Sequence, residues 1–323
     1  MNIGLYDVDS KNFPNLALMK ISAYWKNQGA NVEFMSHLKH YDKVYVSKIF
    51  GDEYSQLDET VISADEIIVG GTGFAISVKN GKEIYNKKLD NQLPKDIENC
   101  YPDYNLYPQL TKNKAYGFLT RGCPNNCSFC LVSEKESRCC HKVADLKNFW
   151  NGQKEIVLLD PNILACSSCN ELLQQLVDSG SKIDFTQGLD ARFITKEVCE
   201  YFKKMKVKMY HFAFDFLQNE EKIFKGLSTF KECMNYDETK SRNAYVYVLT
   251  NYNTTFEQEY YRVKLIQYLG FSPDIRIYRK ATAPRITRDL QRWCNNKIIY
   301  RSCKNFLNYI PRTDGKTIRE IYF

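Results

Sequence analysis

The 323-residue sequence lacks the features that mark several large classes of protein. No stretch approaches the roughly 18 consecutive apolar residues that a membrane-spanning helix needs, so we expect no bilayer-crossing segment and no membrane partner. It contains no low-complexity tract or short repeat, and 44% of its residues are apolar, which excludes a disordered or fibrous protein. The stretch Met1–Asp7 has no basic region, so we expect no secretory signal and a cytoplasmic location.

An excess of one charge and a cysteine content typical of disulfide scaffolds are also missing. The 45 Lys and Arg residues are nearly balanced by 38 Asp and Glu residues, and the net charge of +7 neither excludes nor strongly favours an anionic partner. Twelve cysteines amount to about 4% of the chain, below the roughly 8–10% of a disulfide-stapled protein. In a reducing compartment, clustered cysteines indicate metal binding or catalysis.

The first hundred residues predict a small open α/β domain. A helix is expected over residues 15–25, and strands are expected over residues 3–8, 31–35, 43–47 and 66–70. This order is typical of a doubly wound, Rossmann or flavodoxin-like domain, which we place at residues 1–78. The polar segment 79–113 contains three prolines and is interpreted as a connector with one irregular hairpin.

Residues 114–323 predict a second α/β domain built on a curved parallel sheet. Strands are expected over residues 116–120, 155–160, 182–187, 207–214, 244–250 and 274–278. Strands joined by helices run parallel with right-handed crossovers, so six such units predict a partial (β/α)6, TIM-like barrel followed by C-terminal helices. Functional residues of such barrels lie at the carboxyl ends of the strands.

Three cysteines follow the first of these strands at the spacing C-x3-C-x2-C. They are Cys123, Cys127 and Cys130. Thiolates hold iron–sulfur clusters, usually four to a cluster, so three local ligands would leave one iron open to a small molecule. Two alternatives are a zinc site with a distant fourth ligand, as in a zinc-stabilised nucleic-acid-binding module, and three cysteines packed as small apolar residues.

The cysteine motif, with the aromatic Phe129 before its last cysteine, resembles the motif of the radical S-adenosylmethionine (SAM) superfamily. The resemblance implies that the three cysteines bind a 4Fe-4S cluster and that the fourth iron chelates the amino and carboxylate groups of SAM. It also implies that one electron from the reduced cluster splits SAM into methionine and a 5′-deoxyadenosyl radical. Phe129 would pack near the adenine, and an electron donor of flavodoxin or ferredoxin type would be a partner.

Polar residues at the later strand ends are the other candidates for SAM binding. Asp160 and Asn162 resemble the family's second motif near the SAM amino group, although its paired glycines are missing. Gln187, Asp190 and Arg192 follow the third strand, where the planar guanidinium of Arg192 matches a carboxylate. The alternative is an Asp190–Arg192 pair that stabilises the loop.

Two further strand ends complete the set of candidates. Asn251 follows the fifth strand at a place that resembles the family's adenine-flanking motif, although Thr250 and Asn251 replace its glycine. His211 and Asp215 share one face of the fourth strand, where they are candidates for contact with a substrate that the sequence does not identify.

The open N-terminal domain resembles the cobalamin-binding branch of the superfamily. The matching segments are 15–18 on the first helix and the glycine-rich loop 70–73. The axial-ligand motif Asp-x-His-x-x-Gly is missing, and the histidines of this domain are His37 and His40. A cobalamin-dependent radical SAM methyltransferase is therefore an alternative, as is a domain without the cofactor.

Two features remain open. Cys139, Cys140, Cys166 and Cys169 are candidates for a second metal site, although a single C-x2-C pair is weak evidence. The late region is basic, which fits a solvated helix face, or an anionic substrate or nucleic acid.

Overall fold

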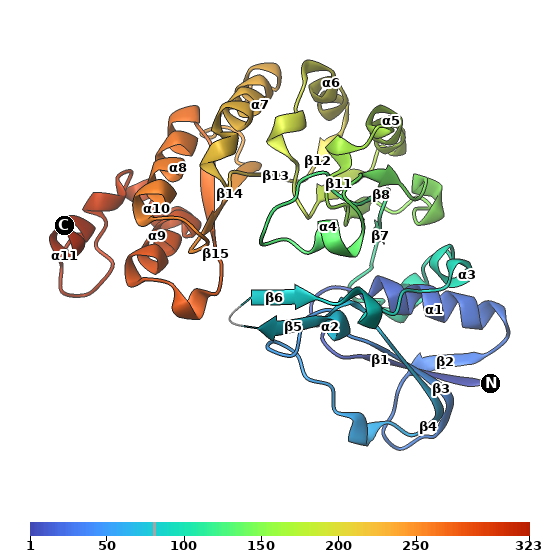
Figure 1. The fold of residues 1–323 in the computed structure, drawn as a ribbon. Coiled ribbons are helices and arrows are strands. Elements are labelled where there is room, and N and C mark those ends of the chain that lie inside the picture. Colours follow the sequence, from blue (N-terminus) through green and yellow to red (C-terminus); the bar gives the residue numbers. More distant parts are fainter. Residues whose placement is uncertain (80–81) are drawn as a thin grey trace. The chain divides into compact units, whose positions relative to one another are not determined.

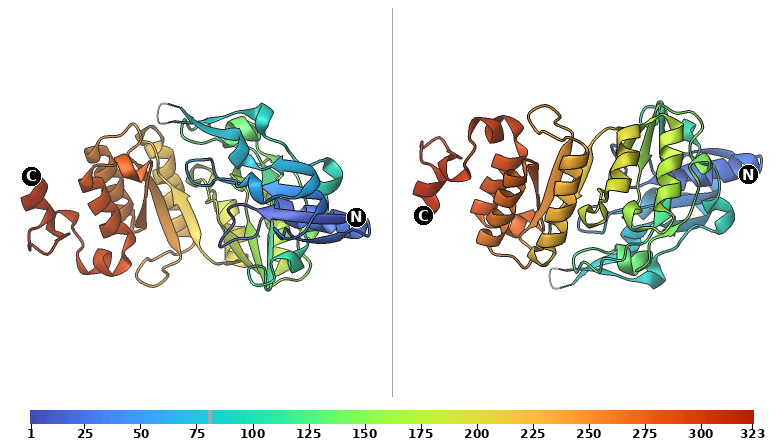
Figure 2. Two further views of the ribbon diagram at one scale, coloured as in Figure 1. Left: turned by 90° about the horizontal axis from the view of Figure 1, so that it is seen from below. Right: turned by 90° about the horizontal axis from the view of Figure 1, so that it is seen from above.

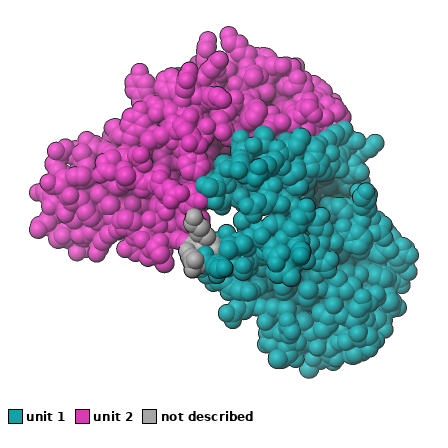
Figure 3. All heavy atoms as spheres, viewed as in Figure 1, with its two compact units in different colours: residues 1–160 teal, residues 161–323 magenta. Residues whose placement is uncertain are grey.

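The computed structural model describes residues 1–79 and 82–323, which form two compact units. They comprise Met1–Asp160 and Pro161–Phe323 (Figure 3). The division falls at the end of the second predicted barrel strand, whereas the sequence predicts domain boundaries at residues 78 and 113. None of the described helices is long and apolar enough to span a bilayer.

The first unit contains a parallel sheet of four strands in the order β2-β1-β3-β4 (Figure 1). The strands are β1 (Asn2–Asp7), β2 (Asn31–Phe34), β3 (Tyr41–Ser47) and β4 (Ala64–Gly70). All four predicted strands are confirmed. Pairing of Ile3 with Val32 on one side and Lys43 on the other places β1 in the middle of the sheet.

One face of this sheet is covered by helix α1 (Leu16–Asn27). Asn15 caps the helix by accepting a hydrogen bond from the Leu18 N–H, and Leu18 packs against Ile3 in the core. The opposite face is covered by the segments around Leu57, Ile62 and Phe74, not by a second long helix. The link from β2 to β3 is six residues long, too short for a crossover helix, so the doubly wound pattern is incomplete.

Short elements occupy the end of the predicted first domain and the predicted connector. Helix α2 (Thr72–Ala75) and strand β5 (Ile76–Lys79) lie at the end of the predicted first domain, and β6 (Lys82–Tyr85) and the short helix α3 (Lys95–Glu98) lie in the predicted connector. Strands β5 and β6 pair antiparallel, so the expected hairpin straddles the predicted boundary at residue 78. The Tyr107 hydroxyl donates to the Asp7 carboxylate at the end of β1, which attaches this segment to the sheet.

The remainder of the first unit holds the segment with the three cysteines. Strand β7 (Lys114–Gly117) pairs in parallel with β10 (Glu155–Leu158). Strand β8 (Thr120–Arg121) pairs antiparallel with β9 (His141–Lys142), so residues 122–140 form a loop closed at its base by two strands. Helix α4 (Val132–Lys135) lies within this loop.

The second unit contains the later predicted strands, with one break. Strand β11 (Lys182–Phe185) pairs with β12 (Lys206–Val207), and β13 (Tyr210–Ala213), β14 (Ala244–Thr250) and β15 (Ser272–Ile277) form a parallel sheet. The single strand expected over 207–214 is therefore two strands with different partners.

Helices alternate with these strands as predicted. They are α5 (Cys169–Ser179), α6 (Lys196–Lys204), α7 (Glu220–Cys233), α8 (Phe256–Leu269), α9 (Arg285–Asn295), α10 (Lys297–Ser302) and α11 (Ile318–Tyr322). Figure 2 shows the orange and red helices gathered beside the last strands. A capping box formed by Thr255 and Gln258 is present at the start of α8.

Strand alternation separates the two faces of the β13-β14-β15 sheet. Phe212 and Val246 are buried, and the Phe212 ring packs edge-on against Phe230 of α7. His211 and Tyr247 point to the opposite, half-buried face. This is the face expected to line a barrel.

Candidate active site

The three motif cysteines lie on the loop between β8 and β9. Cys123, Cys127 and Cys130 are each half-buried, as is Phe129. The Cys130 N–H donates to the Cys127 carbonyl over 3.0 Å, which closes a tight turn between the last two cysteines. All twelve cysteines lie in the described part of the chain, and none forms a disulfide.

A glycine is required where the loop begins. Gly122 has φ +81°, in the left-handed region that L side chains rarely adopt. A Cβ at this position would also collide with the Cys139 carbonyl oxygen and the Ser137 hydroxyl. The first cysteine is therefore held close to the returning arm of the loop, and its own N–H donates to the Ser137 carbonyl over 3.1 Å.

Glu136 fastens the two arms of the loop together. Its carboxylate accepts the Gly122 N–H over 2.8 Å and the Arg121 guanidinium over 2.7 Å. The same guanidinium lies 3.5 Å from the centroid of the Phe118 ring, a close cation–π contact. These contacts fix the orientation of the peptide that precedes Cys123.

Asp160 fixes the strand end that leads into the loop. Its side chain is 4% exposed and accepts the Leu119 N–H at 3.1 Å, the Thr120 N–H at 2.5 Å and the Thr120 hydroxyl at 2.7 Å. Burial raises the pKa of Asp160 to about 6, against the effect of these donors. Every contact described for this carboxylate is internal, so Asp160 acts as a positioning residue for the cysteine loop.

The donor set of this loop fits an iron–sulfur cluster. Soft thiolates are the usual ligands of such clusters, and three of them share one short loop that is clamped at its base. In residues 1–79 and 82–323, no three His, Cys, Asp or Glu side chains are grouped around a single ion position. A cluster binds each thiolate through a different iron, so its ligands do not need to converge on one point.

In the second unit, the candidates from two segments form one network. Asp190 accepts the Arg192 guanidinium through both carboxylate oxygens, at 2.8 and 2.7 Å, and also accepts the Asn162 amide at 3.1 Å. Asp190 in addition caps the turn that contains Arg192. The network brings an amide, an acid and a guanidinium together, but the guanidinium already has a carboxylate partner. Gln187 is exposed nearby in the chain.

His211 lies on the half-buried face of the β13-β14-β15 sheet. Its ring stacks on the Tyr247 ring with centroids 5.2 Å apart. The Arg276 guanidinium lies over the Tyr247 ring, 4.4 Å from its centroid. Burial lowers the pKa of His211, which favours the neutral imidazole. Its Nδ1 atom is buried and has no hydrogen-bond partner among the described residues.

Asp215 and Asn251 take part in internal hydrogen bonds at the strand ends. Asp215 accepts the Leu249 N–H at 3.1 Å, and burial raises the pKa of its carboxyl group. Asn251 has φ +60°, donates its N–H to Glu259 at 2.6 Å, and donates its amide to the Tyr278 carbonyl at 2.8 Å. The Asn251 side chain therefore ties two loops together.

Two buried charged residues of α8 were not foreseen from the sequence. Arg262 is completely buried and donates to the carbonyls of Phe214 and Asp215 at 2.9 and 2.6 Å, and to the Leu249 carbonyl at 2.9 Å. Glu259, 2% exposed, lies one turn away. The signal was present, since both positions fall on the buried stripe of α8 at helical spacing. No comparable sequence pattern indicates the role of Glu136 in the cysteine loop.

The glycine-rich loop of the first unit is explained by internal packing. A Cβ at Gly71 would collide with the Lys48 carbonyl, and one at Gly73 with the Phe50 carbonyl. His37 is exposed, and His40 Nε2 lies within hydrogen-bond distance of the Asp65 carboxylate, at 3.0 Å on the surface. These contacts do not define a corrin site.

Comparison with known proteins identifies a shared fold. No family model matches the sequence, and no curated protein does so either. Among solved structures, the radical S-adenosylmethionine methyltransferase TsrM from Kitasatospora setae, determined with cobalamin and a 4Fe-4S cluster bound, matches with a TM-score of 0.60. The match has 10% sequence identity and covers 85% of this chain and 74% of that chain. The chain thus has an α/β fold, with parallel sheets, similar to that of a radical SAM protein.

Proposed function

We propose that this protein is a radical SAM enzyme that binds a 4Fe-4S cluster through Cys123, Cys127 and Cys130. The observation that supports the proposal most is the C-x3-C-x2-C motif on a loop clamped by Glu136 and Asp160. The fold likeness to a radical SAM protein supports it independently of the motif. When bound, the reduced cluster supplies the electron that cleaves SAM and starts radical chemistry on a substrate.

In this proposal, the residues of the chain hold and orient the reactants. Glu136 and Asp160 hold the loop in one conformation, so that the three thiols are pre-arranged before metal arrives. Asn162, Asp190 and Arg192 form a polar network that offers donors and acceptors to the amino-acid part of SAM. Phe129, Gln187 and Asn251 are assigned to the remainder of SAM.

We assign the substrate contact to the His211 face of the β13-β14-β15 sheet. A neutral imidazole with an unpartnered Nδ1 can donate or accept one hydrogen bond without placing a charge beside a radical. Asp215, whose pKa is raised, lies beside this face. An electron donor of flavodoxin or ferredoxin type completes the set of partners.

Cluster assembly tests the proposal directly. Anaerobically reconstituted protein is expected to contain close to four iron and four sulfide per chain, with absorbance near 400 nm that bleaches with dithionite. Cys127→Ala should lose most of this iron, whereas Cys139→Ala, an exposed cysteine of the same loop, should retain it. Zinc in place of iron, or equal iron in both variants, would contradict the assignment.

A cobalamin-dependent methyltransferase is the second candidate, since the TsrM structure to which the chain is similar contains cobalamin. It predicts that anaerobic protein retains added hydroxocobalamin through gel filtration. Elution of all hydroxocobalamin apart from the protein would contradict the cobalamin-dependent function and leave the cluster proposal unchanged.

A further inference from the structure

The end of the chain has a charge that differs sharply from the rest. Residues 276–323 contain twelve Lys and Arg but only three Asp and Glu, a formal net charge of +9. The whole chain carries +7, so the other 275 residues together carry −2. A mild overall charge therefore conceals a strongly basic region, and such asymmetry is typical of polyanion binding.

Helix α9 displays part of this charge along one exposed face. Arg285, Arg288 and Arg292 are exposed and follow the spacing i, i+3, i+7, which places them on the same side of the helix. They extend over about 10 Å of the helix axis. The first turn of α9 begins with Arg285 and contains no acidic residue, although a helix N-terminus favours negative charge. A bound anion would relieve this repulsion.

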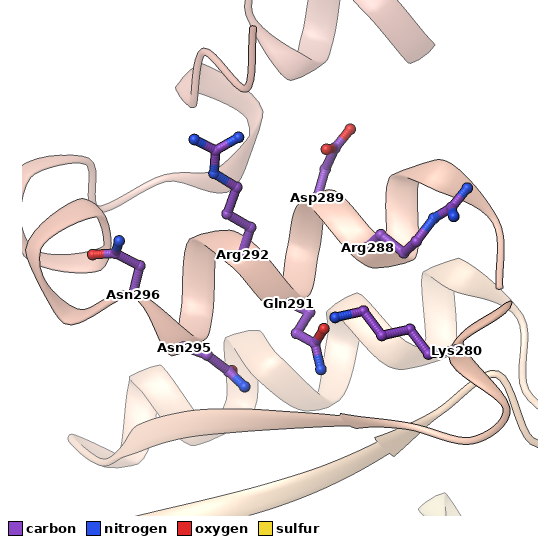
Figure 4. Close-up of a pocket in the computed structure, with 7 residues that line it drawn as sticks. All are labelled: Lys280, Arg288, Asp289, Gln291, Arg292, Asn295 and Asn296. Carbon is purple, nitrogen blue, oxygen red and sulfur yellow. The ribbon is translucent and has the colours of Figure 1, made fainter. Parts of the chain in front are cut away.

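A hollow of about 720 Å³ opens beside this face of α9 (Figure 4). Lys280, Arg288 and Arg292 line it, and Lys280 reaches toward the side chain of Gln291 in Figure 4. Asp289 is the acid in the lining, and it is engaged by the Tyr322 hydroxyl at 2.7 Å and by Arg312 at 3.6 Å. Within the described residues, neither Lys280 nor Arg288 forms an ion pair.

We propose that the α9 face, formed by Arg285, Arg288 and Arg292 together with Lys280 of the preceding turn, binds the phosphodiester backbone of a nucleic acid. Guanidinium groups match phosphate oxygens through paired N–H donors. The cations are spread along a helix and not focused on one point, which fits a row of phosphates better than a single small anion. The proposal concerns a partner and does not depend on the cluster chemistry.

Fluorescence anisotropy with the full chain and a labelled 20-nucleotide single-stranded RNA tests this proposal. The triple variant R285Q/R288Q/R292Q should bind at least tenfold more weakly than the wild type. The slope of log K against log salt should fall by about 2, since each phosphate contact contributes about 0.7. The control K204Q/K222Q/K225Q removes three exposed charges from α6 and α7 and should change affinity less than twofold.

Three outcomes would overturn the proposal: no RNA binding by the wild type, equal loss in both triple variants, or displacement of RNA by tripolyphosphate at the same phosphate concentration. The last would indicate a site for small phosphates. Single-stranded and duplex DNA of equal length distinguish the type of nucleic acid. Far-UV circular dichroism checks that each triple variant is folded. R288E changes a single residue and therefore provides a variant that disrupts the protein less than the triple substitutions. Because no SAM or reductant is present, failure here leaves the enzymatic proposal untouched.

Discussion

Gly122 illustrates how a single residue determines whether the cysteine loop can form. Its positive φ disfavours any residue with a side chain, and the close approach of Cys139 leaves no room for one. Gly152 also has a positive φ, of +85°, but an added Cβ there would meet no atom within 4 Å. Substitution of Gly152 therefore measures the free-energy cost of backbone strain alone, whereas substitution of Gly122 adds the cost of steric collision.

We predict that Gly152→Ala lowers the free energy of unfolding by about 1 kcal/mol, the cost of a left-handed residue with a Cβ. Gly122→Ala should cost about 3 kcal/mol, because the collision adds to that strain. Gly122→Ala should also reduce iron incorporation severalfold, while Gly152→Ala leaves it unchanged. Urea denaturation and iron analysis measure both effects, and equal behaviour of the two variants would contradict the role of Gly122.

Asp160 should make stability depend on pH in an unusual direction. Its folded-state pKa of about 6 lies above the value near 4 of an unfolded aspartate, so the folded state binds the extra proton between these values. Stability should therefore decrease as pH rises from 4 to 6, by up to about 3 kcal/mol. Asp160→Asn should lack this dependence, whereas Asp314→Asn in an exposed turn should keep it. Identical pH profiles for wild type and Asp160→Asn would refute the prediction.

At the scale of elements, α8 joins two strand ends through Arg262. The buried guanidinium donates to the backbone carbonyls of Phe214, Asp215 and Leu249 at the strand ends and to that of Gln258 in its own helix. It thereby replaces the water molecules that these carbonyl oxygens would otherwise need as hydrogen-bond donors. The strand ends of β13 and β14 are the places from which Asp215 and Asn251 project. Arg262 thereby acts as a positioning residue for this edge of the sheet.

Arg262→Met should destabilise the protein by about 3 kcal/mol or more, because it leaves buried carbonyl oxygens without a donor. Lys264→Met on the exposed side of the same helix should change stability by no more than about 0.5 kcal/mol. Urea unfolding of both variants provides the comparison. A loss below 1 kcal/mol for Arg262→Met would show that these carbonyls find other donors.

The sequence was sufficient to predict features that depend on local patterns. Alternation and helical spacing located the strands of the first sheet and the helices of the second unit, and residue spacing located the cysteine loop. The break between β12 and β13 was not predicted, since it arises from pairing with strands distant in the chain. The positioning roles of Glu136 and Asp160 were not predicted for the same reason, because their hydrogen-bond partners lie 14 and 40 residues away in the chain.

At the scale of the whole molecule, the proposed tasks fall to different regions of the chain. A clamped cysteine loop in the first unit would hold the cluster, polar strand ends in the second unit would bind SAM, and a basic C-terminal region would bind a phosphate-rich partner. The likeness to TsrM concerns the fold alone. The charge segregation supports the third.

Product analysis of SAM is the most direct test of the central claim. Reconstituted protein, incubated anaerobically with SAM and dithionite, should form 5′-deoxyadenosine and methionine in equal amounts, and Cys127→Ala should form neither. S-adenosylhomocysteine without 5′-deoxyadenosine would contradict reductive cleavage and support methyl transfer. No conversion of SAM by a protein that contains its full cluster would contradict both reactions.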